Sequence, residues 1–230
     1  MKKISLLFLS SFLTVCSYAQ VTIGLRVAPS LCMNRVKDLD NTDGYTFDKN
    51  GSGMRFAVGP TFDFKFGDNY AFSTGAWYLS SRAGLSMTSD AKNPLTGNPF
   101  LDQKDIVSLQ SVQVPITFKV FTNELTTNLK LYFQLGGLAT INFYEKHKET
   151  TPALVGAYQN KYDLFDISIY MATGINYKIG ESNALFAGFY YNRGLMNIMN
   201  GNTEPNTEKK YKDIAKYNMD MVGLEVGVTF

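Results

Sequence analysis

The chain has 230 residues, of which 22 are lysine or arginine and 20 are aspartate or glutamate. A charge this close to neutral provides no electrostatic attraction for nucleic acid, so we expect no nucleic-acid partner. Aromatic residues make up 14% of the sequence, mostly tyrosine and phenylalanine, and favour strands over helices.

Residues 1–19 carry the features of a secretory signal peptide. Lys2 and Lys3 precede an apolar run from Ile4 to Val15, and Ser17-Tyr18-Ala19 supplies small residues for cleavage. We expect cleavage after Ala19, which leaves residues 20–230 as a single barrel domain, since no linker divides them. The apolar run is shorter than the about 20 residues that a membrane-spanning helix needs. Cys32 is the only cysteine after cleavage, so we expect neither an intramolecular disulfide nor a cysteine-based metal site.

Alternation of apolar and polar residues predicts eight strands after the signal peptide. In chain order they are Val21–Leu31, Met54–Phe66, Tyr70–Met87, Asp105–Phe121, Leu129–Glu145, Tyr162–Ile179, Ala184–Leu195 and Lys216–Phe230. Most exceed the about 9 to 11 residues with which a tilted strand crosses a membrane. The third segment alternates least regularly, over Tyr70–Leu79.

The connections between these segments alternate in length. Short connections are Gly67–Asn69, Thr122–Asn128 and Gly180–Asn183, whose composition is typical of turns. The long polar connections are Cys32–Gly53, Thr88–Lys104, Lys146–Lys161 and Met196–Ala215. Outer-membrane barrels have this pattern, with short periplasmic turns and longer extracellular loops. We therefore expect an all-β, eight-stranded antiparallel up-and-down transmembrane barrel in the cell outer membrane, with both chain ends periplasmic.

The alternation also predicts which side chains face lipid. In the fourth segment Val112, Ile116 and Phe118 alternate with Gln113 and Thr117. Because a lysine or arginine on the lipid face near the midplane costs about 2 to 4 kcal/mol, charged residues should face inward or lie at a rim. The inward set is Arg26, Arg55, Asp63, Lys65, Arg82, Asp166, Lys178 and Glu225, with Lys119 and Lys130 inward or at a rim. Both signs are present, so we expect these groups to neutralise one another rather than to line a pore.

The long connections contain the remaining candidates for chemistry. His147 is the only histidine and lies among hydroxyl and carboxylate groups, but nothing fixes a nucleophile beside it, so we predict no catalytic residue. The first long connection offers oxygen ligands for a hard cation but matches no EF-hand, so we predict no metal site and no cofactor. Those ligands are Asp38, Asp40, Asp43 and Asp48, with Asn34, Asn41 and Asn50. The fourth long connection mixes charges, from Glu204 and Glu208 to Lys209, Lys210, Lys212 and Asp213, and suits contact with a partner.

Four segments suggest a family. They are V-T-I-G-L-R-V-A-P-S at Val21–Ser30, S-L-Q-S-V-Q-V-P-I-T-F-K-V at Ser108–Val120, L-Y-F-Q-L-G-G-L-A at Leu131–Ala139, and G-L-E-V-G-V-T-F at Gly223–Phe230. Together they resemble the PorT-like outer-membrane barrels typical of the Bacteroidetes. The resemblance implies an outer-membrane location and an eight-stranded barrel, and some members act with the type IX secretion system. No catalytic residue comes with the family.

These observations favour a non-enzymatic structural or interaction role in the cell envelope, with secretion accessory as its most concrete version. Expected partners are outer-membrane lipid and other envelope or secretion proteins. Two alternatives remain open at this point: a lipid-modifying barrel enzyme that uses His147, and a soluble periplasmic β-barrel that binds an apolar ligand.

Overall fold

The computed structural model describes residues 20–38, 45–49, 53–89, 102–150, 163–180, 182–198 and 215–230. The expected signal peptide, residues 1–19, lies outside these described residues. Within them, no helix is long and apolar enough to cross a membrane. The regular elements of the described part are β1 (Gln20–Cys32), β2 (Arg35–Asp38), β3 (Tyr45–Lys49), β4 (Gly53–Lys65), β5 (Tyr70–Gly75), β6 (Trp77–Ser89), β7 (Asp102–Phe121), β8 (Leu129–Thr150), β9 (Phe165–Lys178), β10 (Ala184–Gly194), β11 (Ala215–Asn218) and β12 (Asp220–Thr229).

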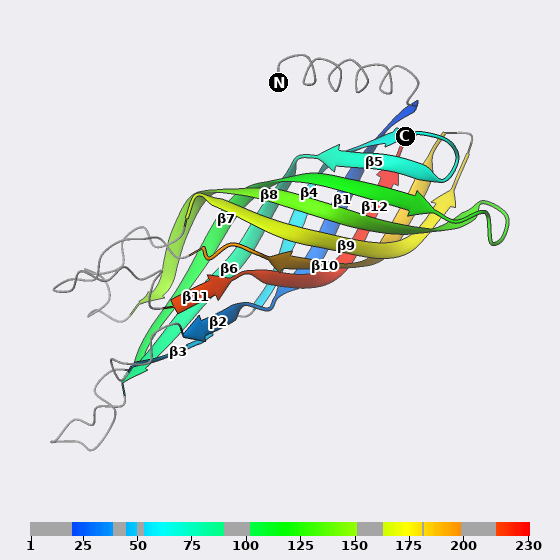
Figure 1. Cartoon of the computed structure of the whole chain (residues 1–230). Coiled ribbons are helices and arrows are strands. Elements are labelled where there is room, and N and C mark those ends of the chain that lie inside the picture. The colour runs from blue at the N-terminus through cyan, green and yellow to red at the C-terminus, as the bar shows by residue number, and fades with distance from the viewer. Residues whose placement is uncertain are drawn as a thin grey trace, which may run out of the picture.

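The strands close into an antiparallel barrel (Figure 1). Around the wall the order is β1, β12, β10, β9, β8, β7, then β5 with β6, then β4, which pairs again with β1. Because β1 has a partner on both sides, the wall has no open edge along β1, and its backbone groups are satisfied within the sheet. This confirms the predicted eight-stranded barrel.

Two wall strands are each interrupted once. The third predicted strand is divided into β5 and β6 at Ala76, opposite Pro60 of β4, which has no N–H to donate to the ladder. Ala76 still donates its N–H to the Pro60 carbonyl, at 3.3 Å. The eighth predicted strand is divided at Met219, and its first part, β11, pairs with β2 in the same register in which β12 pairs with β1. The first long connection also contains β2 and β3, where we expected only loop.

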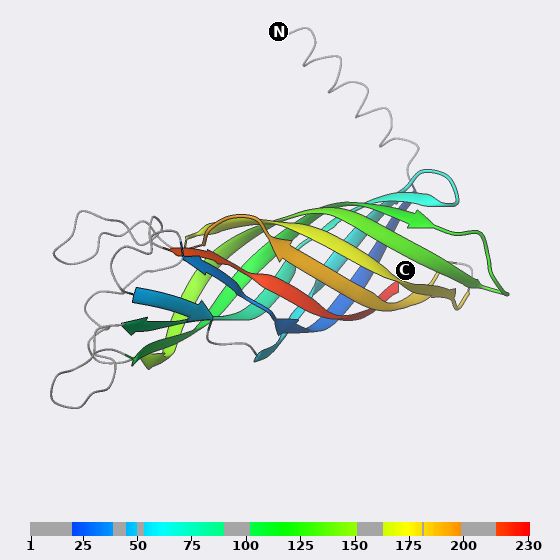
Figure 2. The same cartoon turned by 60° about the horizontal axis from the view of Figure 1, so that its bottom comes forward.

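The strand ends that lead into the long connections lie at the opposite end of the barrel from the short turns (Figures 1 and 2). At one end are the turns that join β4 to β5, β7 to β8 and β9 to β10, together with both ends of the barrel domain. Two of these turns use the left-handed backbone region, with φ of 76° at Gly67 and 67° at Asn128. The other end carries β2, β3, β11 and the outer parts of β6, β7 and β8, and we call it the long-loop end.

The side chains are arranged as in a membrane barrel, with apolar groups outside and polar groups inside. Outward residues such as Ile116, Leu135 and Phe189 are 57%, 58% and 68% exposed. The residues between them along the strands, such as Thr117 and Gln134, are buried in the interior. This is the reverse of a soluble barrel with an apolar cavity, so the soluble alternative is wrong.

Candidate functional site

The middle of the barrel interior is occupied by a buried ion pair. Arg26 of β1 and Glu225 of β12 are both 2% exposed, and the Arg26 Nε lies 2.6 Å from the Glu225 Oε2. Tyr132 of β8 and Tyr170 of β9 donate hydrogen bonds to the two oxygens of the same carboxylate, at 2.7 and 2.5 Å. Glu225 therefore accepts bonds from three other strands, which satisfies most of its lone pairs away from water.

Aromatic rings surround the guanidinium of this ion pair. The Arg26 Cζ lies 4.1 Å from the ring centroid of Trp77 and 4.8 Å from that of Tyr190. Its NH2 also donates to the Tyr170 hydroxyl at 3.2 Å. Ring faces stabilise a desolvated cation by about 2 kcal/mol or more. The central layer thus joins β1, β6, β8, β9, β10 and β12 through one charge network.

A second charged layer lies nearer to the short-turn end. Lys119 of β7 donates to Asp63 of β4 at 2.8 Å, and Ser73 of β5 donates to the other Asp63 oxygen at 2.5 Å. The Lys119 ammonium also lies 5.7 Å from the Tyr132 ring centroid. Tyr132 therefore contacts both charged layers, since its hydroxyl reaches Glu225.

Toward the long-loop end the interior also contains apolar side chains. Leu79, Val107, Leu109, Leu138 and Ile198 are almost fully buried there, together with the ring of Tyr217. An eight-stranded barrel has room for little more than its own side chains. The described interior is therefore filled by two ion pairs, rings, aliphatic and uncharged polar groups, and by Asp166, which has no ion-pair partner among the described residues.

The inward charges predicted from the sequence fall into two groups. Arg26, Asp63, Lys119, Asp166 and Glu225 are buried in the interior, as expected. The others are more exposed: Arg55, Lys65, Arg82 and Lys130 are half-buried, and Lys178 is exposed at the short-turn end of β9. The structure brings Arg26 to Glu225 and Lys119 to Asp63 as neutralised pairs.

The predicted loop candidates are not assembled into a site by the described residues. His147 lies inside β8, opposite Val107, because β8 extends to Thr150 rather than ending at Glu145. Asp38 and Asp48 belong to different strands, β2 and β3, and Asn34 donates to the Arg82 carbonyl. The rest of this set lies outside the described residues, namely Asp40, Asp43, Asn41 and Asn50 and the charged residues of the fourth connection. Among the residues that the structure describes, no three potential metal ligands cluster.

The sequence analysis missed a charged cluster on the outer wall at the long-loop end. Arg35 of β2 contacts Asp220 of β12 through two hydrogen bonds, of 2.5 and 3.1 Å, and donates to the Gly194 carbonyl. The bond to Asp220 raises the pKa of the Arg35 guanidinium above its ordinary value. Tyr191 and the Gly194 N–H also donate to Asp220. The alternation of Arg35, Val36 and Lys37 is the signal that could have identified this short strand.

A family model described as outer membrane protein beta-barrel domain matches residues 18–200 of the chain. The chain belongs to this family. It is an outer-membrane β-barrel protein of the small, eight-stranded kind, which agrees with its apolar exterior and closed wall. No curated protein matches the chain.

Solved outer-membrane proteins share the fold of this family member at low sequence identity. OprG from Pseudomonas aeruginosa has a TM-score of 0.55 and 15% identity, over 91% of this chain and 95% of that one. Neisserial surface protein A has a TM-score of 0.50 and 12% identity, over 92% and 97% of the two chains. At such identity the likeness shows the fold alone.

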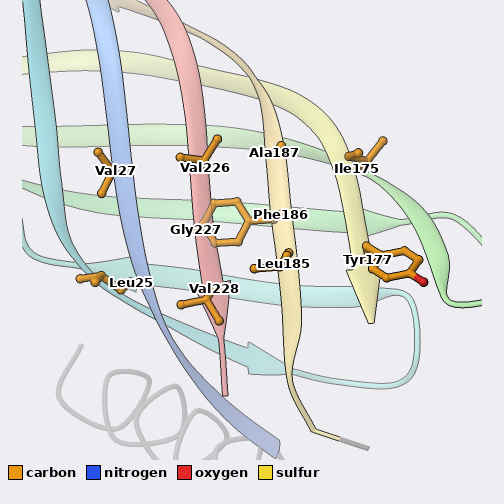
Figure 3. A pocket seen from close by; sticks show the side chains of 10 residues that line it. All are labelled: Leu25, Val27, Ile175, Tyr177, Leu185, Phe186, Ala187, Val226, Gly227 and Val228. Carbon is orange, nitrogen blue, oxygen red and sulfur yellow. The ribbon is translucent and has the colours of Figure 1, made fainter. Parts of the chain in front are cut away.

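The outer face of this outer-membrane barrel contains an apolar groove near the short-turn end (Figure 3). It measures about 560 Å³ and runs across β1, β12, β10 and β9. Ala187 and Gly227 lie at its floor, and Leu25, Val228 and Leu185 form its sides. Such a surface suits contact with the hydrocarbon chains that surround a membrane barrel.

Proposed function

We propose that this protein is a non-enzymatic structural and interaction component of the outer membrane, with its long-loop end outside the cell and both ends of the barrel domain in the periplasm. The packed interior carries this proposal. The paired charges and rings leave the barrel rigid and its centre occupied, so the surfaces that remain for function are the long-loop end and the lipid face. Cleavage of residues 1–19 as a signal peptide belongs to the same proposal.

The most concrete setting is protein secretion. The sequence resembles PorT-like barrels, and some of these act with the type IX system. A barrel with a packed interior cannot itself conduct folded cargo, because an eight-stranded wall encloses only side chains. In this proposal the protein therefore assists secretion by contacting other envelope proteins through its long connections.

Removal of one long connection should separate folding from this function. We expect deletion of residues 201–212, replaced by a short Gly-Ser linker, to leave the barrel folded and to reduce secretion to the level of a strain lacking the protein. Folding is measured as the shift between boiled and unboiled protein on a gel of outer-membrane extract. Secretion is measured as the amount of cargo in the medium relative to the periplasm.

A His147→Ala variant is the control for chemistry, and we expect it to secrete cargo and maintain membrane lipids as the parent does. Parental secretion in the strain lacking the protein would remove the secretion role. Loss of activity in the His147 variant alone would favour the enzyme alternative.

A further inference from the structure

The wall of the barrel divides at the long-loop end, between β2 and β3. The ladder that joins β1 to β4 ends at the pair Cys32 and Gly53. Beyond it β2 pairs with β11, whereas β3 pairs with β6. β2 and β3 lie side by side in both views, but no ladder joins them among the described strands (Figures 1 and 2). The two strands therefore face each other across a gap in hydrogen bonding.

A polar pocket of about 550 Å³ lies at this division. Four of its lining residues are cationic, and we call Arg35, Lys37, Lys49 and Lys216 the basic seam. The remaining lining residues are Asn34, Val36, Asp48 and Asn218. Among the described residues, Asp48 in the lining and Asp220 beside Arg35 leave the cations in excess, so these residues give the pocket a positive charge.

Two lysines of the basic seam lie directly opposite each other. Lys37 of β2 and Lys216 of β11 are cross-strand partners, so their side chains leave the same face of the two-stranded sheet. Like charges in this position destabilise a sheet. Arg35 is neutralised by Asp220, but among the described residues neither lysine ammonium has a hydrogen-bond or ion-pair partner. A bound anion would remove this repulsion.

The basic seam lies just beyond the apolar band of the barrel. Three outward residues, Leu31 of β1, Val222 of β12 and Tyr191 of β10, are paired side by side. On β12 and β10 they are the last apolar residues of the outward face before the long-loop end. The next outward residues on those two strands are Asp220 and Arg193. On the β1 side Met33 precedes Arg35 and Lys37. On these three strands, charged outward side chains therefore begin beyond the apolar band, as expected where lipid headgroups meet water.

We propose that the basic seam binds phosphate groups carried on a glycan, of the kind borne by the glycolipid of the outer leaflet. Phosphate oxygens accept hydrogen bonds from ammonium and guanidinium groups, and two or more phosphates match a pocket with several cations. Because the basic seam lies just beyond the apolar band, its position favours a membrane-borne headgroup over a free polysaccharide, although both can carry phosphate groups. This inference names a ligand for the proposed interaction role. It rests on the proposed orientation, in which the long-loop end lies outside the cell.

Purified full-length protein in phosphatidylcholine nanodiscs tests the inference, because both faces of a nanodisc are open to solution. The probe is deacylated lipopolysaccharide, with its dephosphorylated form as the comparison, titrated by calorimetry at low and high salt. We expect the phosphorylated glycan to bind, with an affinity that falls as salt rises. The double variant Lys37→Gln/Lys216→Gln should bind at least about tenfold more weakly, since it removes two of the four cations of the basic seam.

The matched control is Lys130→Gln/Lys178→Gln, which removes two lysines at the short-turn end and should bind as the parent does. All variants are first checked for the heat-dependent gel shift. Intact lipopolysaccharide incorporated in the nanodisc distinguishes the sources. If the protein binds intact lipopolysaccharide more tightly than the deacylated glycan, the ligand is the membrane-borne glycolipid. If it binds the two equally, the phosphorylated headgroup alone is recognised. No binding at low salt, or equal binding by the seam variant and the parent, overturns the inference without affecting the proposed orientation.

Discussion

Replacing Arg26 with leucine should lower the free energy of unfolding by about 3 to 5 kcal/mol, because removal of one partner leaves a buried charge unpaired. Glu225 would keep its hydrogen bonds from Tyr132 and Tyr170 but would lose its only counter-ion at 2.6 Å. The rings of Trp77 and Tyr190 would also lose the cation they contact. The measurement is urea unfolding of the protein in detergent micelles, followed by the heat-dependent gel shift.

Arg35→Leu provides the matched control for this variant. It breaks an ion pair of similar geometry whose arginine side chain is 44% exposed, so water can replace the arginine at Asp220 and the expected loss is smaller than for Arg26→Leu. The double variant Arg26→Leu/Glu225→Leu should recover part of the loss, because both buried charges are then removed together. Equal losses for Arg26→Leu and Arg35→Leu would show that the central layer does not stabilise the barrel.

Gly188→Val should destabilise the barrel by about 1 to 3 kcal/mol through overpacking. A Cβ atom at Gly188 would lie 2.3 Å from the Tyr132 hydroxyl oxygen and 2.5 Å from the Thr173 carbonyl oxygen. Gly188 and its cross-strand partner Gly174 leave the space that the Tyr132 ring occupies. A side chain there would move the Tyr132 phenol away from Glu225, and the central layer would lose one of its hydrogen bonds.

Gly137→Ala is the control for this substitution, since its Cβ would meet only the Ser168 carbonyl, at 3.9 Å. We expect its urea midpoint to stay close to that of the parent. In a Tyr132→Leu background, Gly188→Val should cost less than in the parent, although the Thr173 carbonyl still opposes the new side chain. Full additivity of the two substitutions would contradict the proposed contact.

The alternation of apolar and polar residues was sufficient to predict the wall strands and the side of the wall that each residue faces. Each position contacts either lipid or the barrel interior, whichever strand it pairs with. Thr117 and Phe118 are neighbours on β7, and Thr117 is buried in the interior whereas Phe118 is exposed on the outer face. The interruptions at Ala76 and Met219 were not predictable in the same way. The interruption at Ala76 depends on the partner strand, because Pro60 of β4 lies opposite it.

The contact within the central ion pair could not be predicted from the sequence. The alternation along their strands predicts that Arg26 and Glu225 both face the interior. They are 199 positions apart, however, and their contact depends on the register in which β1 pairs with β12. The role of Tyr132 in holding Glu225 is evident only from the structure. β2 was missed because it has four residues and lies within a polar connection, where Val36 between Arg35 and Lys37 is the main sign of alternation.

The orientation of the barrel in the outer membrane is tested most directly by labelling of intact cells with a membrane-impermeant maleimide. The variants are Asp48→Cys in β3 at the long-loop end and Asp68→Cys in the turn between β4 and β5. Cys32 is 1% exposed and should not react. We expect cysteine at position 48 to be labelled on intact cells, and cysteine at position 68 only after the outer membrane is permeabilised. Labelling of position 68 but not of position 48 on intact cells would contradict the account.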